Sequence, residues 1–404
     1  MAQIETHTED AIRRFESYIK ADPENELIWT SLGDLYHQAG RFDKAIACFE
    51  KCLMLDDGNM IARGRLANVL ISQHRFDEAE KMIRSIVKQT GEDNALLHNL
   101  GLTLFYQKRF EEAWELFKQA RGQGLRAPAN LAYMVYSLHM NNDTAEALRL
   151  AEIWREESPG PKTEGYISLM ELDHGDMDAA RERAGKVLRQ ESANADANTV
   201  MGTWHMEQHE VERAVSHFEK VVSSDPGNPR GWQGLGLAHM YRQDFAKAIR
   251  TFEKVQTLMP DNATNHLLIG WAKLAGKDAI GSEKSFRDAV DADRNFGEAH
   301  GGLATALVFQ NRLEEARTEI KKAMGLDRKG FGAVFAQAIS MQLKGQGRQA
   351  VKLAAKVLEQ SPVPRSKPLI EHIQHYLRTQ TPQSIAVKPK PAALLENEKD
   401  HPKG

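Results

Sequence analysis

Two pairs of side chains have the spacing of a possible metal site. His205 and His209 stand four residues apart with Glu207 between them, so on a helix both imidazoles would project from one side. Cys48 and Cys52 have the same spacing. A zinc site needs a third and a fourth ligand, and the local spacing supplies neither. We therefore interpret the histidines as packing residues and the thiols as small core residues, and we expect no metal and no cofactor.

Two glycine-containing segments share single features with nucleotide-binding motifs. The segment GKDAIGS (276–282) lacks the Gly-Lys-Ser/Thr ending of a phosphate loop, and no predicted strand precedes it. The segment GWQGLG (231–236) falls within a predicted helix, so its glycines are expected at packing positions. No Ser-His-Asp or Cys-His arrangement can be chosen from local spacing. We predict that the protein is not an enzyme.

Charge and hydropathy exclude several classes of partner. The 53 Lys and Arg residues against 56 Asp and Glu give a net charge of −3, so no broad positive field favours nucleic acid. No stretch approaches the roughly 18–20 apolar residues of a membrane span. The sequence MAQIETHTED at the start lacks a basic region followed by an apolar run, and two cysteines cannot form a disulfide framework. We expect a cytoplasmic protein without an integral membrane segment.

The elements that would position these side chains repeat every 34 residues. One position is alanine nine times and serine once in ten units, with one residue missing before the fifth unit; we number it position 20 of the repeat. Its residues are Ala45, Ala79, Ala113, Ala147, Ala180, Ala214, Ala248, Ser282, Ala316 and Ala350. Apolar residues within each unit follow three- and four-residue spacing, which predicts two amphipathic helices per unit.

Two further positions describe how the helices of one unit pack. Position 8 is usually small, as at Gly33, Gly101 and Gly236, and position 24 is often large, as at Phe49 and Phe252. Small residues at positions 8 and 20 let two helices approach closely, and the position-24 side chain fills the gap beside them. One such hairpin cannot bury its own apolar face, so the units are expected to stack.

This pattern resembles the tetratricopeptide repeat family over residues 26–362. The unit 229–262 is the most similar, and its signature residues are Trp232, Leu235, Gly236, Ala248, Phe252 and Pro260. The resemblance implies an all-α fold, a right-handed α-solenoid of about ten helix-turn-helix repeats with a terminal capping helix. The predicted segments are a partial N-terminal repeat with only its second helix (1–25), units 1–3 (26–127), degenerate units 4–5 with a possible seam (128–194), units 6–10 (195–362), the capping helix (363–378) and a disordered Pro/Lys-rich tail (379–404).

The N-terminal segment leaves two interpretations open. It is either a worn terminal repeat or a docking edge through which the chain associates with another subunit, including a second copy.

The resemblance implies that the first helix of each repeat lines a concave groove, with positions 2, 5, 9 and 12 pointing into it. Apolar side chains dominate these positions. The predicted partner-binding residues are Ile71, Leu102, Phe105, Tyr136, Met206, Leu237, Met240, Leu267, Trp271, Leu274, Val308 and Phe335. An open groove gains no stability from so many apolar residues, which favours a binding surface. The alternative is that the next repeat buries part of them.

The groove chemistry favours an apolar or amphipathic segment of a partner protein. The family's basic clamp for acidic chaperone tails has no counterpart here, because only Asn68 among the corresponding residues fits it. We predict a non-catalytic scaffold or adaptor. The alternatives are a cytosolic assembly factor for a pilus, secretion or envelope-polysaccharide machine, whose own Leu394-Leu395 occupies the groove, and a regulatory subunit of a separate catalytic chain.

Overall fold

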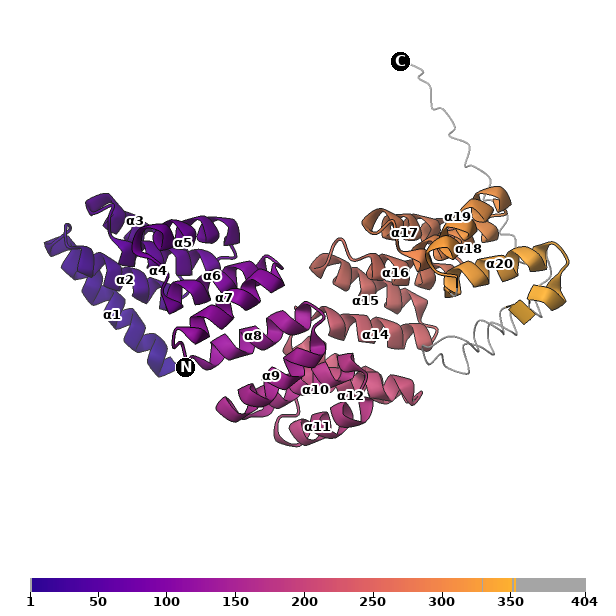
Figure 1. Ribbon diagram of the computed structural model, residues 1–404, viewed down its shortest axis with the longest axis horizontal. Helices are drawn as coiled ribbons and strands as arrows, with labels where there is room; N and C mark the ends of the chain where they lie inside the picture. Colours follow the sequence, from indigo (N-terminus) through magenta and orange to yellow (C-terminus); the bar gives the residue numbers. More distant parts are fainter. Residues whose placement is uncertain (1, 329, 351, 354–404) are drawn as a thin grey trace, which may run out of the picture. The chain divides into compact units, whose positions relative to one another are not determined.

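The computed structural model describes residues 2–328, 330–350 and 352–353 (Figure 1). Every regular element among them is a helix, which confirms the predicted all-α fold. The chain divides into two compact units, Met1–Ala180 and Arg181–Gly404, and the described residues of each form a stack of helical hairpins. None of the described helices combines the length and the apolar character that crossing a bilayer requires. The predicted capping helix (363–378) and tail (379–404) lie outside the described residues.

In the first unit, consecutive helices pack side by side along the chain. The helices are α1 (Ala2–Ala21), α2 (Glu26–Gln38), α3 (Phe42–Leu55), α4 (Met60–Ser72), α5 (Phe76–Thr90), α6 (Asn94–Tyr106), α7 (Phe110–Gly122), α8 (Pro128–Met140), α9 (Thr144–Glu157) and α10 (Pro161–His174). Helix α11 (Met177–Gln190) contains the division between the units.

The second unit continues the same alternation of first and second helices. Its helices are α12 (Ala195–Glu207), α13 (Val211–Ser224), α14 (Pro229–Tyr241), α15 (Phe245–Leu258), α16 (Ala263–Ala275), α17 (Ala279–Ala292), α18 (Gly297–Phe309), α19 (Leu313–Leu326) and α20 (Phe331–Leu343).

Local sequence explains where the first helices begin. Asn25, Asn59 and Asp93 precede α2, α4 and α6, and each side chain accepts a hydrogen bond from a backbone N–H of the first turn. Helices α8 and α10 begin with proline. Proline lacks a backbone N–H, but an N–H at the first helical residue would have no acceptor within the helix, so no hydrogen bond is lost. These signals set the phase of each helix, and hence the side chains that it turns toward its neighbours.

The turn between the two helices of a repeat requires one left-handed residue, at position 15. It has a positive φ in all ten repeats, and glycine occupies it in only three. The ten residues are Gly40, His74, Lys108, Asn142, Gly175, His209, Gln243, Lys277, Asn311 and Gly345. A side chain in this backbone conformation is strained, so seven of the turns carry a local cost in stability.

The packing predicted within each repeat is confirmed. A Cβ atom at Gly33 would stand 2.6 Å from the ring of Phe49, and one at Gly101 would stand 2.7 Å from the ring of Phe117. Every residue at position 20, from Ala45 to Ala350, is at most 1% exposed. The small residues therefore let a buried aromatic ring lie directly against the backbone of the partner helix.

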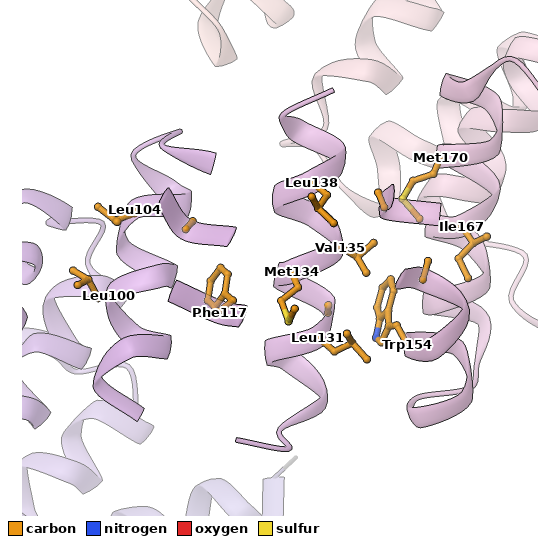
Figure 2. Close-up of a cluster of buried hydrophobic side chains, with 14 of the residues drawn as sticks. Leu100, Leu104, Phe117, Leu131, Met134, Val135, Leu138, Trp154, Ile167 and Met170 are labelled. Carbon is orange, nitrogen blue, oxygen red and sulfur yellow. The ribbon is translucent and has the colours of Figure 1, made fainter. Parts of the chain in front are cut away.

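The same core continues through the less regular repeats of the first unit. Figure 2 shows Phe117 on one side of α8, and Trp154 and Ile167 on the other. All three side chains are buried in one apolar cluster with Leu131 and Met134 of α8. The stack from α6 to α10 is therefore held by one continuous core rather than by separate hairpins.

Candidate functional site

The predicted partner-binding residues all lie on the first helices of repeats, whose common surface we call the first-helix face. In the first unit it is formed by α2, α4, α6, α8 and α10, and in the second by α12, α14, α16, α18 and α20. Nine of the twelve side chains keep some exposure. Leu237 is 40% exposed; the half-buried ones are Ile71, Leu102, Phe105, Tyr136, Met206, Met240, Trp271 and Phe335.

Four aromatic rings of the first helices α6 and α8 contact one another. The ring of Phe105 lies edge-on to that of Tyr133, with centroids 5.2 Å apart, and Tyr133 makes the same kind of contact with Tyr136 at 5.6 Å. Tyr106 stacks on Phe76 of α5 at 5.2 Å and remains 44% exposed. We call Phe105, Tyr106, Tyr133 and Tyr136 the aromatic patch. Its rings support one another, so they are oriented before any partner arrives.

Hydrogen bonds hold the patch in place. The hydroxyls of Tyr106 and Tyr133 are 2.9 Å apart, which joins α6 to α8. Burial raises the pKa of Tyr133, and the hydrogen bond to Tyr106 raises it further, so the phenol stays neutral. Beside the patch, buried His139 donates from Nε2 to Asp173 of α10 at 2.9 Å, and its Nδ1 lies 2.8 Å from the hydroxyl of Tyr166.

Polar groups of α2 and α4 contact one another and neighbouring helices across repeats. The Arg65 guanidinium lies 3.4 Å from the Asp34 carboxylate, and His37 Nε2 is 2.9 Å from the hydroxyl of Ser72. The side-chain amide of Asn99 donates to the Asn68 amide oxygen at 2.7 Å. These groups hold adjacent repeats together, and Asn68, the one residue that fits a basic clamp, is engaged by its neighbour.

Three predicted lining residues of the second unit lie in the core instead. Leu267 and Leu274 are 8% exposed and Val308 is fully buried. They belong to one apolar cluster against which Trp271 and Phe335 also pack. The prediction is corrected for these three residues, because a side chain sealed in the core offers no surface to a partner. The alternative noted from the sequence, burial by the next repeat, describes this end of the array.

Helix α20 joins the same cluster through Ala338 and Ile339. It packs more closely against α18 than against α19. A Cβ atom at Gly301 would stand 2.3 Å from the backbone nitrogen of Ala333, so the two helices touch through bare backbone. The Glu298 carboxylate accepts from the backbone N–H groups of Phe331 and Gly332 at 2.6 and 2.8 Å, which caps α20 from α18.

Ring contacts complete the closure of this end. The Trp271 ring lies 5.5 Å from that of Phe331 and 6.2 Å from that of Phe335, both on α20. Helix α20 thus lies over the surface that α16 and α18 would otherwise expose.

The helical hairpins, their period and the glycine-against-ring packing agree with comparisons to known proteins. Family models described as tetratricopeptide repeat match residues 6–58, 38–101, 95–121, 171–229, 229–262 and 297–320, which together are more than half of the chain. This chain belongs to the tetratricopeptide repeat family. Such repeats form protein-interaction scaffolds, because stacked hairpins present extended binding surfaces.

Two curated relatives share part of this tetratricopeptide array. Protein CTR9 homolog of Arabidopsis thaliana is 32% identical over 119 residues, which are 28% of this chain and 11% of the relative. Anaphase-promoting complex subunit 3 of Schizosaccharomyces pombe is 28% identical over 110 residues, 25% of this chain and 16% of the relative. The matched segments therefore span less than a fifth of either relative.

The tetratricopeptide packing also accounts for the histidine pair. Buried His205 lies with Nδ1 2.7 Å from the Glu210 carboxylate and stacks on His217 at 5.2 Å. His209 occupies the left-handed turn position, and its Nδ1 is 2.8 Å from the hydroxyl of Tyr241. Among the described residues, no three His, Cys, Asp or Glu side chains gather as a metal site would require.

The cysteines are likewise part of the tetratricopeptide core, and the two glycine segments form part of α14 and the turn into α17. Cys48 and Cys52 are at most 3% exposed, and burial raises the pKa of the Cys48 thiol to about 12. Gly234 and Gly236 within α14 lie against the rings of Phe218 and Phe252. In the segment 276–282, the Asp278 side chain caps α17.

Tyr106 and Tyr133 of the aromatic patch were missed by the sequence analysis. Tyr133 stands at position 6 and Tyr106 at position 13 of their repeats, outside the four positions taken to face a groove. One sequence feature could have indicated Tyr133: position 6 is aromatic in two successive repeats, at Tyr133 and Tyr166.

Proposed function

We propose that this protein is a non-catalytic cytoplasmic scaffold that binds an apolar or amphipathic segment of a partner protein on its first-helix face. The observation that carries the proposal is the aromatic patch of α6 and α8. Its rings contact one another in a continuous series, and Tyr106 at its edge is 44% exposed. Large, pre-oriented and partly exposed rings are the side chains on which binding energy usually concentrates.

Apolar anchoring fits this surface better than charge recognition. Ile71 and Leu102 lie half-buried in the same core cluster as the patch residues and extend its apolar character toward α4. Charged and amide groups of α2, α4 and α6 already contact one another across repeats. A partner segment would therefore gain most of its affinity by covering rings and aliphatic carbons.

The second unit offers a smaller apolar surface on the same kind of helices. Leu237 of α14, at position 9, is 40% exposed. Met206 of α12 and Met240 of α14, both at position 12, are half-buried. We include these three residues in the proposed surface. Trp271 and Phe335 are half-buried, and the Trp271 ring contacts Phe331 and Phe335 of α20, so both contribute only part of their surface.

The test is an affinity purification from the source cell with quantitative mass spectrometry. The variant is Tyr106→Ala combined with Leu102→Ala, and the matched control is Met54→Ala on the second helix α3, where the side chain is 78% exposed. We expect the patch variant to lose at least about tenfold of a partner that the control retains. Equal recovery by both variants would refute the placement of the site.

The same purification separates the kinds of scaffold. Components of a pilus, secretion or polysaccharide machine would identify an assembly factor. An enzymatic activity that co-purifies and is lost at high salt or in detergent would identify a regulatory subunit of a catalytic chain.

A further inference from the structure

The displacement of α20 leaves a cleft between α19 and α20. It has a volume of about 590 Å³, and its apolar lining includes Ile320 and Met324 of α19 and Met341 of α20. This cleft lies between the second helix of one repeat and the first helix of the next. None of its lining residues is among the predicted partner-binding residues of the first-helix face.

A matched pair of isoleucines shows that the cleft is a departure from the regular repeat. Ile83 and Ile320 both occupy position 24. Ile83 is 1% exposed because α6 packs directly over it, whereas Ile320 is half-buried because α20 lies toward α18. Ile320, Met324 and Met341 are therefore all partly exposed along the cleft.

The rim of the cleft is strongly basic. Arg317, Lys321, Arg328 and Lys344 line it, and none of its lining residues in the described part of the chain is acidic. Arg317 pairs with Glu314 at 3.0 Å. Within the described residues, no ion pair engages the other three cations. This local excess of positive charge contrasts with the net charge of −3 for the whole chain.

We propose that this cleft binds an acidic segment of another protein that carries two or three adjacent aliphatic residues. The aliphatic side chains would cover Ile320, Met324 and Met341, and the flanking carboxylates would pair with Lys321 and Lys344. The argument for this occupant is charge complementarity, since apolar floor and basic rim occur together in one cleft. A nucleotide fits less well, because none of the lining residues is an aromatic ring on which a base could stack.

The experiment measures binding of a fluorescein-labelled peptide to the full chain by anisotropy. The probe is Glu-Glu-Leu-Leu-Glu-Glu, and the reference peptide is Lys-Lys-Leu-Leu-Lys-Lys. We expect the acidic probe to bind at least about tenfold more tightly than the basic one, with an affinity that falls as salt is raised. Equal binding of the two peptides, or binding of neither, would overturn the proposal.

Charge-reversal variants locate the probe. The double variant Lys321→Glu and Lys344→Glu changes exposed side chains and should lower the affinity at least about tenfold. Lys254→Glu on α15, an exposed residue of the same unit outside the cleft, should leave it unchanged. Equal losses in both variants would show a general charge effect and contradict the site.

A shortened chain distinguishes another protein from the chain itself as occupant. Residues 394–398 read Leu-Leu-Glu-Asn-Glu and have the proposed chemistry. Removing residues 391–404 should leave the affinity for the probe unchanged. A gain of more than about tenfold would show that the chain's own segment competes for the cleft, and would replace the proposed occupant.

Discussion

The ring of Phe252 lies against the backbone of Gly236, so closely that a Cβ atom at Gly236 would stand 2.4 Å from Phe252 Cε1. Phe252 is fully buried, so its ring has no free space into which to move. The same relationship joins Gly270 to Phe286, where the distance would be 2.5 Å. This contact sets the spacing between the two helices of a repeat.

Replacing Gly236 by alanine should therefore destabilise the second unit. We expect a loss of about 2 kcal/mol, because the added methyl group forces a buried ring or its helix to shift. Gly64→Ala is the control, since Gly64 lies inside α4 with no atom near its Cβ direction, and it should stabilise by about 0.5–1 kcal/mol. Chemical denaturation followed by circular dichroism measures both. A neutral Gly236→Ala would contradict this account of the core.

Glycine at the turn position should stabilise a repeat that lacks it. Lys277 has a φ of 68° in the turn between α16 and α17. Lys277→Gly relieves about 1–2 kcal/mol of backbone strain, but glycine also raises the entropy of the unfolded chain, which offsets part of this. We expect the free energy of unfolding to rise by about 0.5–1 kcal/mol. The reverse change Gly40→Ala, at φ 69°, should destabilise by a similar amount. Melting temperatures that move in the same direction for both variants would refute the explanation.

Stability should fall at acid pH in part through His217. Burial lowers the pKa of His217 to about 4, and the neighbouring His205 and Lys220 add to the effect. The Nδ1–H of His217 donates to the Asn198 amide oxygen at 2.8 Å. Because the unfolded chain takes up this proton at a higher pH than the folded chain does, stability is lost as the pH falls from about 6.5 toward 4.

The measurement is the urea midpoint as a function of pH. His217→Gln should flatten the profile between pH 6.5 and pH 4 by roughly 1–2 kcal/mol relative to the unsubstituted protein. His7→Gln serves as the control, because His7 is exposed on α1. If both variants followed the profile of the unsubstituted protein, the proton uptake would have to be assigned to other groups.

Both thiols should react slowly in the folded protein. Burial raises the pKa of Cys48 to about 12 and also raises that of Cys52, so little thiolate forms at pH 8. A thiol reagent such as dithionitrobenzoate should modify two groups per chain in denaturant and few in native buffer. Rapid reaction of the native protein would show that the hairpin of α2 and α3 opens readily.

Trp271 and Tyr106 should respond differently to truncation. Trp271→Ala removes a ring that contacts Phe286, Phe331 and Phe335, and we expect a loss of about 3 kcal/mol. Tyr106→Ala removes an exposed ring that stacks on Phe76, has edge contacts with Phe105 and Tyr133 and makes one hydrogen bond. We expect a loss of about 1 kcal/mol. A larger loss for Tyr106 would show that the aromatic patch serves stability rather than binding.

Local pattern was enough to predict the helices and the contacts within a repeat. Ala45 and its counterparts at position 20 are buried as expected, and Gly33 and Phe49 meet as the spacing of positions 8 and 24 required. These contacts join residues about 16 apart within one hairpin, so the period that identifies the repeat also identifies its core. The interpretation of His205, Cys48 and Cys52 as packing residues follows from the same register, whereas His209 is an exposed turn residue.

The accessible surface was decided by the tertiary structure. The repeat register predicted that Trp271, at position 9, and Val308, at position 12, line a groove. Val308 is instead fully buried, and Trp271 is half-buried against Phe331 and Phe335 of α20. Helix α20 crosses toward α18. That crossing depends on Gly301 meeting the backbone near Ala333 and on Glu298 capping a helix more than thirty residues away. The repeat register predicts which residues pack inside a typical hairpin. Whether a side chain is exposed depends instead on the angle between neighbouring hairpins. That angle is set by the volumes of side chains that are far apart in the sequence.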